Sequence, residues 1–352
     1  MITWRFKNSK LWFWIISPLV ILIFICLPFF LTEGGVYIPA AIFSKISNKN
    51  NHLPSVSPTG STSNLPENIL IFGGDIMLSR NVEAKMEKYN DYSWPFIKIS
   101  SLFSGADLAI ANLESPFLVT NNYQVPVGSF SFKANPKSMA GLSLSGFDVL
   151  SLANNHMLNQ GAKGLSDTEK ILDQAGVSYT GLASKNLVVK ESHGIKFAFL
   201  SYTYAADSKS LANMLDFSHA QSDIKTAKEK ADVVIVLMHA GTEYTRTPNN
   251  QQIKFAHAVI DAGADLVIGS HPHWIQSAEK YQGKMIFYSL GNLIFDQMWS
   301  LGTKTGLALK LHFTGKDLSQ IEYLPLSIKD YGQADLMPDS QNRAAILKFL
   351  EN

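Results

Sequence analysis

Polar side chains that can bind metal ions follow five separate apolar segments of this sequence. They are Asp75 after residues 69–74, Asn112 and Glu114 after 108–111, Asn154, Asn155 and His156 after 149–153, His239 after 233–238, and His271 with His273 after 266–270. In layered α/β folds, ligand sites gather beyond the carboxyl ends of the strands. If the apolar segments are strands, these side chains meet at one place.

Each segment taken alone also fits a purely structural role. A single Asp after two glycines is commonly a turn residue or a helix N-cap, and a pair of asparagines tolerates left-handed backbone. The pair His271 and His273 is harder to explain in this way, because Pro272 favours extended backbone at His271, where alternate residues project to the same side. The joint occurrence at five strand ends is therefore the signal.

The expected ligand set combines carboxylate, amide and imidazole groups and contains no thiolate. Its members are Asp75, Glu114, Asn155, His239, His271 and His273. Such a mixed nitrogen and oxygen set suits Mn²⁺, Fe or Zn²⁺. One ion needs fewer ligands, whereas two ions about 4 Å apart that share a carboxylate would use the whole set and could hold the attacking and leaving oxygens of a phosphoryl transfer.

Segments of strand length alternate with amphipathic segments through most of the chain. Strands are expected at 69–72, 108–111, 149–152, 196–201, 233–238, 266–268, 285–289 and 307–313, and helices near 79–89, 162–175, 219–230 and 249–262. This alternation predicts a layered α/β architecture in a single domain over residues 67–352.

The N-terminal part predicts a membrane anchor. Residues 11–31 carry no charge over 21 positions, enough to cross a hydrocarbon core of roughly 30 Å. Basic residues precede this segment, so residues 1–10 are expected to be a cytoplasmic tail, 11–31 a single transmembrane signal anchor and 32–66 a flexible linker to an extracytoplasmic domain. A cleavable signal peptide is the alternative, but its apolar core is usually only about 7–15 residues.

The global composition excludes some classes of protein. Lys and Arg number 30 and Asp and Glu number 29, so the charge balance gives no reason to expect nucleic-acid binding. Cys26 is the only cysteine, which rules out a disulfide within the chain.

Six segments together resemble the CapA/PgsA family of bacterial capsule and poly-γ-glutamate biosynthesis proteins, a branch of the calcineurin-like metallophosphoesterases. They are 74–80 (GDIMLSR), 112–116 (NLESP), 151–156 (SLANNH), 239–244 (HAGTEY), 263–273 (GADLVIGSHPH) and 287–296 (FYSLGNLIFD). The resemblance implies an α-β-β-α metallophosphoesterase-like sandwich and a metal-dependent hydrolase-like protein in capsule biosynthesis, export or anchoring. The implied partners are the lipid bilayer, a capsular polymer such as poly-γ-glutamate, and membrane subunits of a capsule synthase.

The resemblance also implies individual roles. Glu114 would bridge two ions, one completed by Asn155, His239 and His271 and the other held by Asp75 and His273. His156 would be the catalytic residue that protonates the leaving oxygen. Arg80, Asn154 and Glu243 are further candidates for substrate binding.

Met77 departs from the metallophosphoesterase pattern, whose first motif is Asp-x-His. A thioether is a poor ligand for hard or borderline ions, so the first ion is expected to be one ligand short. This leaves an alternative function open, in which the protein is a non-catalytic polymer-binding or assembly subunit of a capsule synthase that uses a residual metal site.

Overall fold

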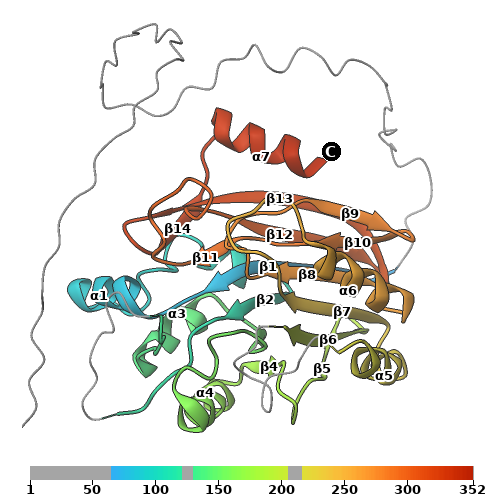
Figure 1. The fold of residues 1–352 in the computed structure, drawn as a ribbon, viewed down its shortest axis with the longest axis horizontal. Helices are drawn as coiled ribbons and strands as arrows, with labels where there is room; N and C mark the ends of the chain where they lie inside the picture. Colours follow the sequence, from blue (N-terminus) through green and yellow to red (C-terminus); the bar gives the residue numbers. More distant parts are fainter. Residues whose placement is uncertain (1–64, 121–129, 205–215, 352) are drawn as a thin grey trace, which may run out of the picture. The chain divides into compact units, whose positions relative to one another are not determined.

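The computed structural model describes residues 65–120, 130–204 and 216–351 (Figure 1). These residues lie in one compact unit, Thr62–Asn352. The segment 11–31, where the sequence predicts a membrane anchor, lies outside the described residues. Within the described ranges, no helix combines the length and the apolar character that a membrane span requires.

Two β-sheets form the centre of this unit (Figure 1). The first has the order β14-β13-β12-β1-β2-β3-β4, and β11 pairs with β1. Its strands are β1 (Glu67–Ile76), β2 (Leu108–Leu113), β3 (Val149–Ser151), β4 (Ser178–Thr180), β11 (Asn292–Ile294), β12 (Thr305–Thr314), β13 (Asp317–Lys329) and β14 (Gln333–Leu336). The second sheet has the order β5-β6-β7-β8-β10-β9. Its strands are β5 (Val188–Ser192), β6 (Ile195–Thr203), β7 (Val233–His239), β8 (Leu266–Ser270), β9 (Ala278–Tyr281) and β10 (Lys284–Phe287).

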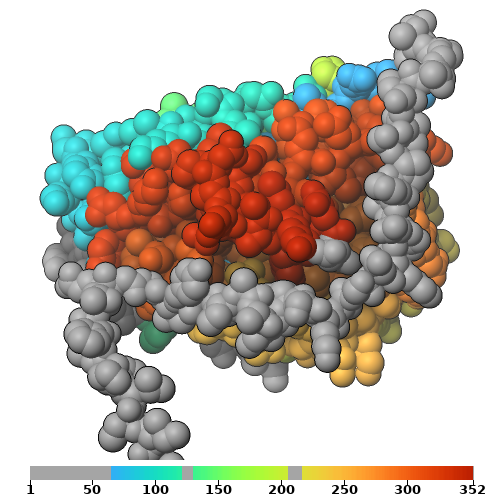
Figure 2. Space-filling view, turned by 90° about the horizontal axis from the view of Figure 1, so that it is seen from above, coloured from blue at the N-terminus to red at the C-terminus, as the bar shows by residue number. Residues whose placement is uncertain are grey.

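Helices cover the outer face of each sheet. The first sheet carries α1 (Arg80–Tyr89), α2 (Ser100–Ser104), the 3-10 helix η2 (Pro136–Ser138), α3 (Met139–Leu144) and α4 (Gly161–Ala175), and the second carries α5 (Phe217–Lys228) and α6 (Asn250–Asp261). The C-terminal helix α7 (Gln341–Glu351) packs near β13, and Figure 2 shows this red segment over the orange strands.

Three buried apolar clusters match the interfaces between these layers. Ile71 of β1 packs outward with residues of α1–α4, whereas Leu70 and Phe72 pack inward against Phe199 and Ile235 of the second sheet. The third cluster lies between the second sheet and α5 and α6. The α-β-β-α layering expected from the sequence is therefore confirmed, and the continuous apolar run of β1 follows from burial of both its faces.

Glycine at position 74 permits the close approach that places Asp75. A Cβ atom on Gly74 would lie 1.8 Å from the carbonyl oxygen of Gly291, so no other residue fits without displacing the backbone. The Asp75 N–H donates to this same carbonyl at 3.0 Å, and β1 and β11 pair with Asp75 opposite Asn292. The glycine thereby brings the end of β1 beside β11.

Candidate metal centre

The polar residues that follow the strands converge where the carboxyl ends of both sheets meet. Strands β1, β2 and β3 of the first sheet deliver Asp75, Glu114 and Asn155, and β7 and β8 of the second deliver His239 and His271. The site therefore joins the two sheets and is not confined to the edge of one.

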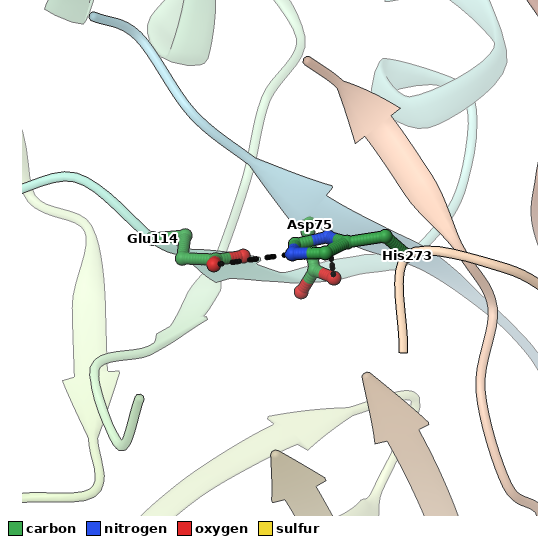
Figure 3. Close-up of side chains that lie close together, drawn as sticks. All are labelled: Asp75, Glu114 and His273. Carbon is green, nitrogen blue, oxygen red and sulfur yellow. Dashed lines mark ion pairs between the residues drawn. The ribbon is translucent and has the colours of Figure 1, made fainter. Parts of the chain in front are cut away.

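Asp75, Glu114 and His273 form the most compact part of the site (Figure 3). Each offers one ligand atom, and these atoms all lie within 4.8 Å of one another. His273 stands between the two carboxylates, with Nδ1 at 3.4 Å from Asp75 Oδ2 and Nε2 at 3.9 Å from Glu114 Oε1. All three residues are buried. Two carboxylates and an imidazole at this spacing have the geometry and the chemistry to hold a divalent cation.

Glu114 is a buried carboxylate without a hydrogen-bond donor. Neither of its oxygens has a hydrogen-bond partner among the described residues, although the residue is fully buried. Burial, followed by the charges of Asp75 and Glu243, raises the pKa of Glu114 well above its usual range. The raised pKa means that ionising this buried carboxyl group is costly, and a bound cation would offset that cost.

Asp75, in contrast, is surrounded by donors. Burial alone would raise the pKa of Asp75, but the hydrogen bond to His273 and the imidazoles of His239 and His273 hold it below its usual range. Its Oδ1 accepts from Asn112 Nδ2 at 2.7 Å, and its Oδ2 accepts from the backbone N–H of His271 at 3.1 Å. Asp75 is therefore fixed as a carboxylate in a single orientation.

A second group of potential ligands lies beside the first. His239 Nε2 is 2.9 Å from Asn155 Oδ1 and 3.2 Å from His271 Nδ1, so an amide oxygen and two ring nitrogens face one another. Burial lowers the pKa of His239 well below its usual value, and burial together with the charge of His273 lowers the pKa of His271 to about 4. Both imidazoles are therefore neutral at pH 7, as metal ligation requires.

The backbone of the His-Pro-His segment differs from the expectation. His271 has φ 95° and His273 has φ 57°, so both occupy left-handed backbone and the predicted extended conformation at His271 is wrong. The ring centroids are 6.1 Å apart, and the two rings join different groups of ligands. Such strained backbone in non-glycine residues persists where the surrounding structure holds it, often at functional sites.

Asn154 has a different role from the substrate contact expected for it. Its side chain is fully buried and donates to Asn112 Oδ1 at 3.1 Å and to the Leu113 carbonyl at 2.8 Å. Its own oxygen accepts from the backbone N–H of His156 and of Met157. Both ends of this amide are therefore engaged within the protein, and the amide shapes the loop that carries Asn155 and His156.

Asn112 and Asn292 form hydrogen bonds with the candidate ligands and so fix their orientation. Asn112 donates to Asp75, and its Nδ2 lies 3.2 Å from His239 Nδ1. Asn292 Oδ1 lies 2.9 Å from His273 Nδ1, while its Nδ2 donates to Gln297 Oε1 and to the Thr303 carbonyl. Because Asn292 presents an acceptor, His273 carries its proton on Nδ1 and leaves Nε2 for a ligand. The sequence places Asn292 after a strand but gives no sign of this contact.

His156 and Arg80 flank the centre on either side of an aromatic ring. The His156 ring stacks on Phe132 with centroids 4.0 Å apart, and its Nε2 is 3.9 Å from Glu114 Oε1. The Arg80 guanidinium lies over the same Phe132 ring at 4.8 Å and pairs with Asp296. Arg80 is buried and has φ 50°, so its side chain is not a solvated one on the surface of α1.

Glu243 and Met77 occupy contrasting positions. Glu243 is exposed, yet its charge affects the pKa values of Glu114, His156 and His271, which places it close to the site. Met77 is fully buried in the apolar cluster below α1–α4, and its sulfur accepts from the Ser79 N–H at 3.1 Å. Met77 therefore serves packing.

Comparisons with known proteins agree with these observations. The family model described as "Bacterial capsule synthesis protein PGA_cap" matches residues 69–297. The capsule biosynthesis protein CapA of Bacillus anthracis is 33% identical over 275 residues, which cover 73% of this chain and 66% of that protein, or just under two thirds of its length. The PGA biosynthesis protein CapA of Bacillus subtilis strain 168 is 32% identical over 292 residues, which cover 79% of this chain and 76% of that protein.

A solved structure shares the fold. The crystal structure of a hypothetical protein from Thermus thermophilus aligns with a TM-score of 0.51 and 18% sequence identity, and the alignment covers 74% of this chain and 99% of that one. This likeness concerns the fold alone.

Proposed function

Because this chain belongs to the bacterial capsule synthesis protein family, we propose that it acts on a capsular polymer through a divalent metal centre. The names of the two matched relatives describe them as capsule or PGA biosynthesis proteins. The polymer is poly-γ-glutamate, and the step is its synthesis, export or anchoring. The protein works as a metal-dependent hydrolase at the outer face of the membrane, where residues 11–31 anchor it.

The environment of Glu114 is the strongest support for the metal centre. A fully buried carboxylate with no hydrogen-bond donor among the described residues has few physical explanations, and a bound cation is the simplest. Asp75 and His273 complete a half-site around it. Asn155, His239 and His271 supply the neighbouring half-site, so one or two ions of Mn²⁺, Fe or Zn²⁺ can be held.

Such a centre has a defined chemistry. A bound divalent ion lowers the pKa of water and polarises a phosphoryl or acyl oxygen. The protein itself fixes the ligands through Asn112 and Asn292 and excludes water through the Phe132 and Phe295 rings that pack on His156 and His273. His156 stands beside Glu114, where it can hand a proton to a leaving oxygen.

The metal content of the purified full-length protein tests this proposal. We expect Mn²⁺ titration of the metal-depleted protein to show one or two saturable sites per chain. A protein that takes up no ion at millimolar Mn²⁺ contradicts the metal centre, whatever its role in the capsule.

Replacing Asn292 is expected to weaken the metal centre without removing a ligand. In Asn292→Ala, the His273 ring loses the nearer acceptor for its Nδ1 proton and keeps only Asp75 Oδ2 at 3.4 Å, so the ring is held less firmly. We expect Mn²⁺ affinity to fall roughly 10–100-fold, the usual effect of losing a group that orients a ligand. Calorimetric titration measures this, and Asn292→Asp, which keeps the acceptor, should recover most of the affinity. Equal affinities for wild type and Asn292→Ala would contradict the role.

The position of Met77 favours a second candidate function. Met77 is buried in packing and contributes no ligand where a hydrolase of this type has a histidine. A centre that lacks one ligand suits a subunit that binds polymer carboxylates, or assembles with synthase membrane subunits, without cleaving a bond. The two candidate functions differ in whether the protein turns over a substrate, and both require the metal ion.

The membrane location has its own test. Because residues 11–31 follow a basic tail, we expect the domain to lie outside the cell. Protease added to intact, wall-stripped cells should degrade residues 65–351. Full protection of the domain would place it in the cytoplasm.

A further inference from the structure

A pocket of about 450 Å³ adjoins the metal centre on the side of α1. It is lined by Arg80, Asn81, Asp296, Met298, Trp299 and Tyr331. We call it the Trp299 pocket. In Figure 1, α1 lies beside β11 and β14, the elements that border this set of residues.

Two series of ring contacts connect the Trp299 pocket to the metal centre. Trp299 meets the ring of Tyr244 edge-on at 5.9 Å, and Tyr244 in turn stacks against His273 at 6.1 Å. On the other side, the Arg80 guanidinium lies over Phe132, the ring that stacks on His156. A molecule whose reactive group lies at the metal centre would reach the pocket if it is long enough to pass these rings.

The charges of the pocket cancel. Arg80 pairs with Asp296, whose other oxygen accepts from the Asn81 backbone N–H at 3.1 Å and from its side-chain amide at 2.9 Å. At the rim, Lys85 lies over the Tyr331 ring and pairs with Asp330. An anionic group entering the pocket would meet carboxylates already engaged with these two cations, so it would lose its hydration with little in return. The pocket is thus poorly suited to a further glutamate unit of a polymer.

The lining suits an uncharged ring with polar edges. Trp299 is 63% exposed and Tyr331 is 43% exposed, so two aromatic groups lie open to solvent beside a fixed set of hydrogen-bonding groups. A pyranose ring presents C–H groups on its face and hydroxyls around its edge. The aromatic faces can pack against the C–H groups of the sugar. The amide, guanidinium and carboxylate groups of Asn81, Arg80 and Asp296 can form hydrogen bonds with its hydroxyls.

We infer that the Trp299 pocket binds a sugar unit belonging to the molecule whose anionic group reaches the metal centre. This inference rests on the proposed function for the metal centre, and it names the second chemical component of the substrate. The left-handed backbone of Arg80 supports it, because such a backbone persists only where surrounding contacts hold it, and the contacts of Asp296 with Arg80 and Asn81 do so here. The substrate is then the proposed polymer joined to a glycan through an ester, phosphoester or acyl group, and not the bare polymer.

Titration with chitotetraose tests the inference in full-length protein. The detergent should be zwitterionic and free of sugar, because a glucoside or maltoside would compete. We expect saturable binding of the tetrasaccharide with or without Mn²⁺, and Trp299→Ala should weaken it by roughly tenfold, while Trp299→Phe weakens it less. Leu301→Ala serves as the matched control, since Leu301 is 55% exposed and does not line this pocket. It should leave binding unchanged.

Competition with a glutamate peptide tests whether the pocket binds a sugar or the polymer itself. Tetra-γ-glutamate added without metal should not displace the sugar. Displacement of the sugar by this peptide, the absence of saturable sugar binding, or identical affinities for wild type and Trp299→Ala would each overturn the inference. If the wild-type protein binds the sugar and does not bind Mn²⁺, the result would instead contradict the proposed metal centre and leave the sugar site standing.

Discussion

Glutamine at position 114 is expected to abolish tight metal binding and, at the same time, to stabilise the metal-free protein. The Glu114 carboxylate lies within the compact group formed with Asp75 and His273 and has no donor on either oxygen. Loss of a ligand should lower Mn²⁺ affinity by more than the roughly 100-fold that marks the upper end for residues that only orient a ligand. Calorimetric titration of Glu114→Gln measures this effect.

The stability of the metal-free variant should move in the opposite direction. The buried Glu114 carboxyl group has no hydrogen-bond partner among the described residues and lies near the Asp75 carboxylate, and the neutral amide of Gln relieves a cost of about 1 kcal/mol or more. Thermal unfolding without metal should therefore show a higher midpoint for Glu114→Gln than for wild type. Glu279→Gln, which changes a carboxylate that accepts from Tyr288 outside the centre, should lose stability and leave metal binding unaltered. A Glu114→Gln protein that is less stable without metal and still binds Mn²⁺ would show that Glu114 is an ordinary core residue.

We expect His156→Ala to lower the rate of catalysis strongly and to leave metal binding unchanged. The His156 ring is held by Phe132 and by Asn159 Oδ1, 2.8 Å from its Nδ1, so Nε2 faces the centre without belonging to either group of ligands. If His156 protonates the leaving oxygen, its loss should lower turnover of an aryl phosphodiester in Mn²⁺ by about 10²–10⁴-fold. Mn²⁺ affinity should stay close to that of wild type.

His219→Ala is the control for this comparison, because His219 is exposed on α5. Turnover in His156→Ala equal to wild type would contradict the assigned role. No metal-dependent turnover in wild type would favour the non-catalytic subunit that Met77 suggests.

The sequence predicted which residues meet because strand ends carry a local signal. Asp75, Glu114 and His239 each follow a run of buried residues, and the rule that sites lie at carboxyl ends places them together. The strands and helices around them agree with the expectations from periodicity, including α4 and α6. Sequence order alone does not assign each strand to one of the two sheets, and that division sets which ligands face each other.

The features that the sequence did not predict depend on contacts distant along the chain. Asn292 reaches His273 because β11 pairs with β1, and nothing in the spacing of either residue indicates this pairing. The long strand β13 was not predicted, since its residues are mostly half-exposed and Pro325 interrupts the pattern. The left-handed backbone at His271 overrode the extended preference of a residue before proline.

Crystals of the protein soaked in Mn²⁺ and measured for anomalous scattering test the central claim most directly. We expect an anomalous peak within bonding distance of Asp75, Glu114 and His273, with any second peak beside Asn155, His239 and His271. Clear density for these side chains with no anomalous peak among them, at a Mn²⁺ concentration that saturates any site in solution, would contradict it.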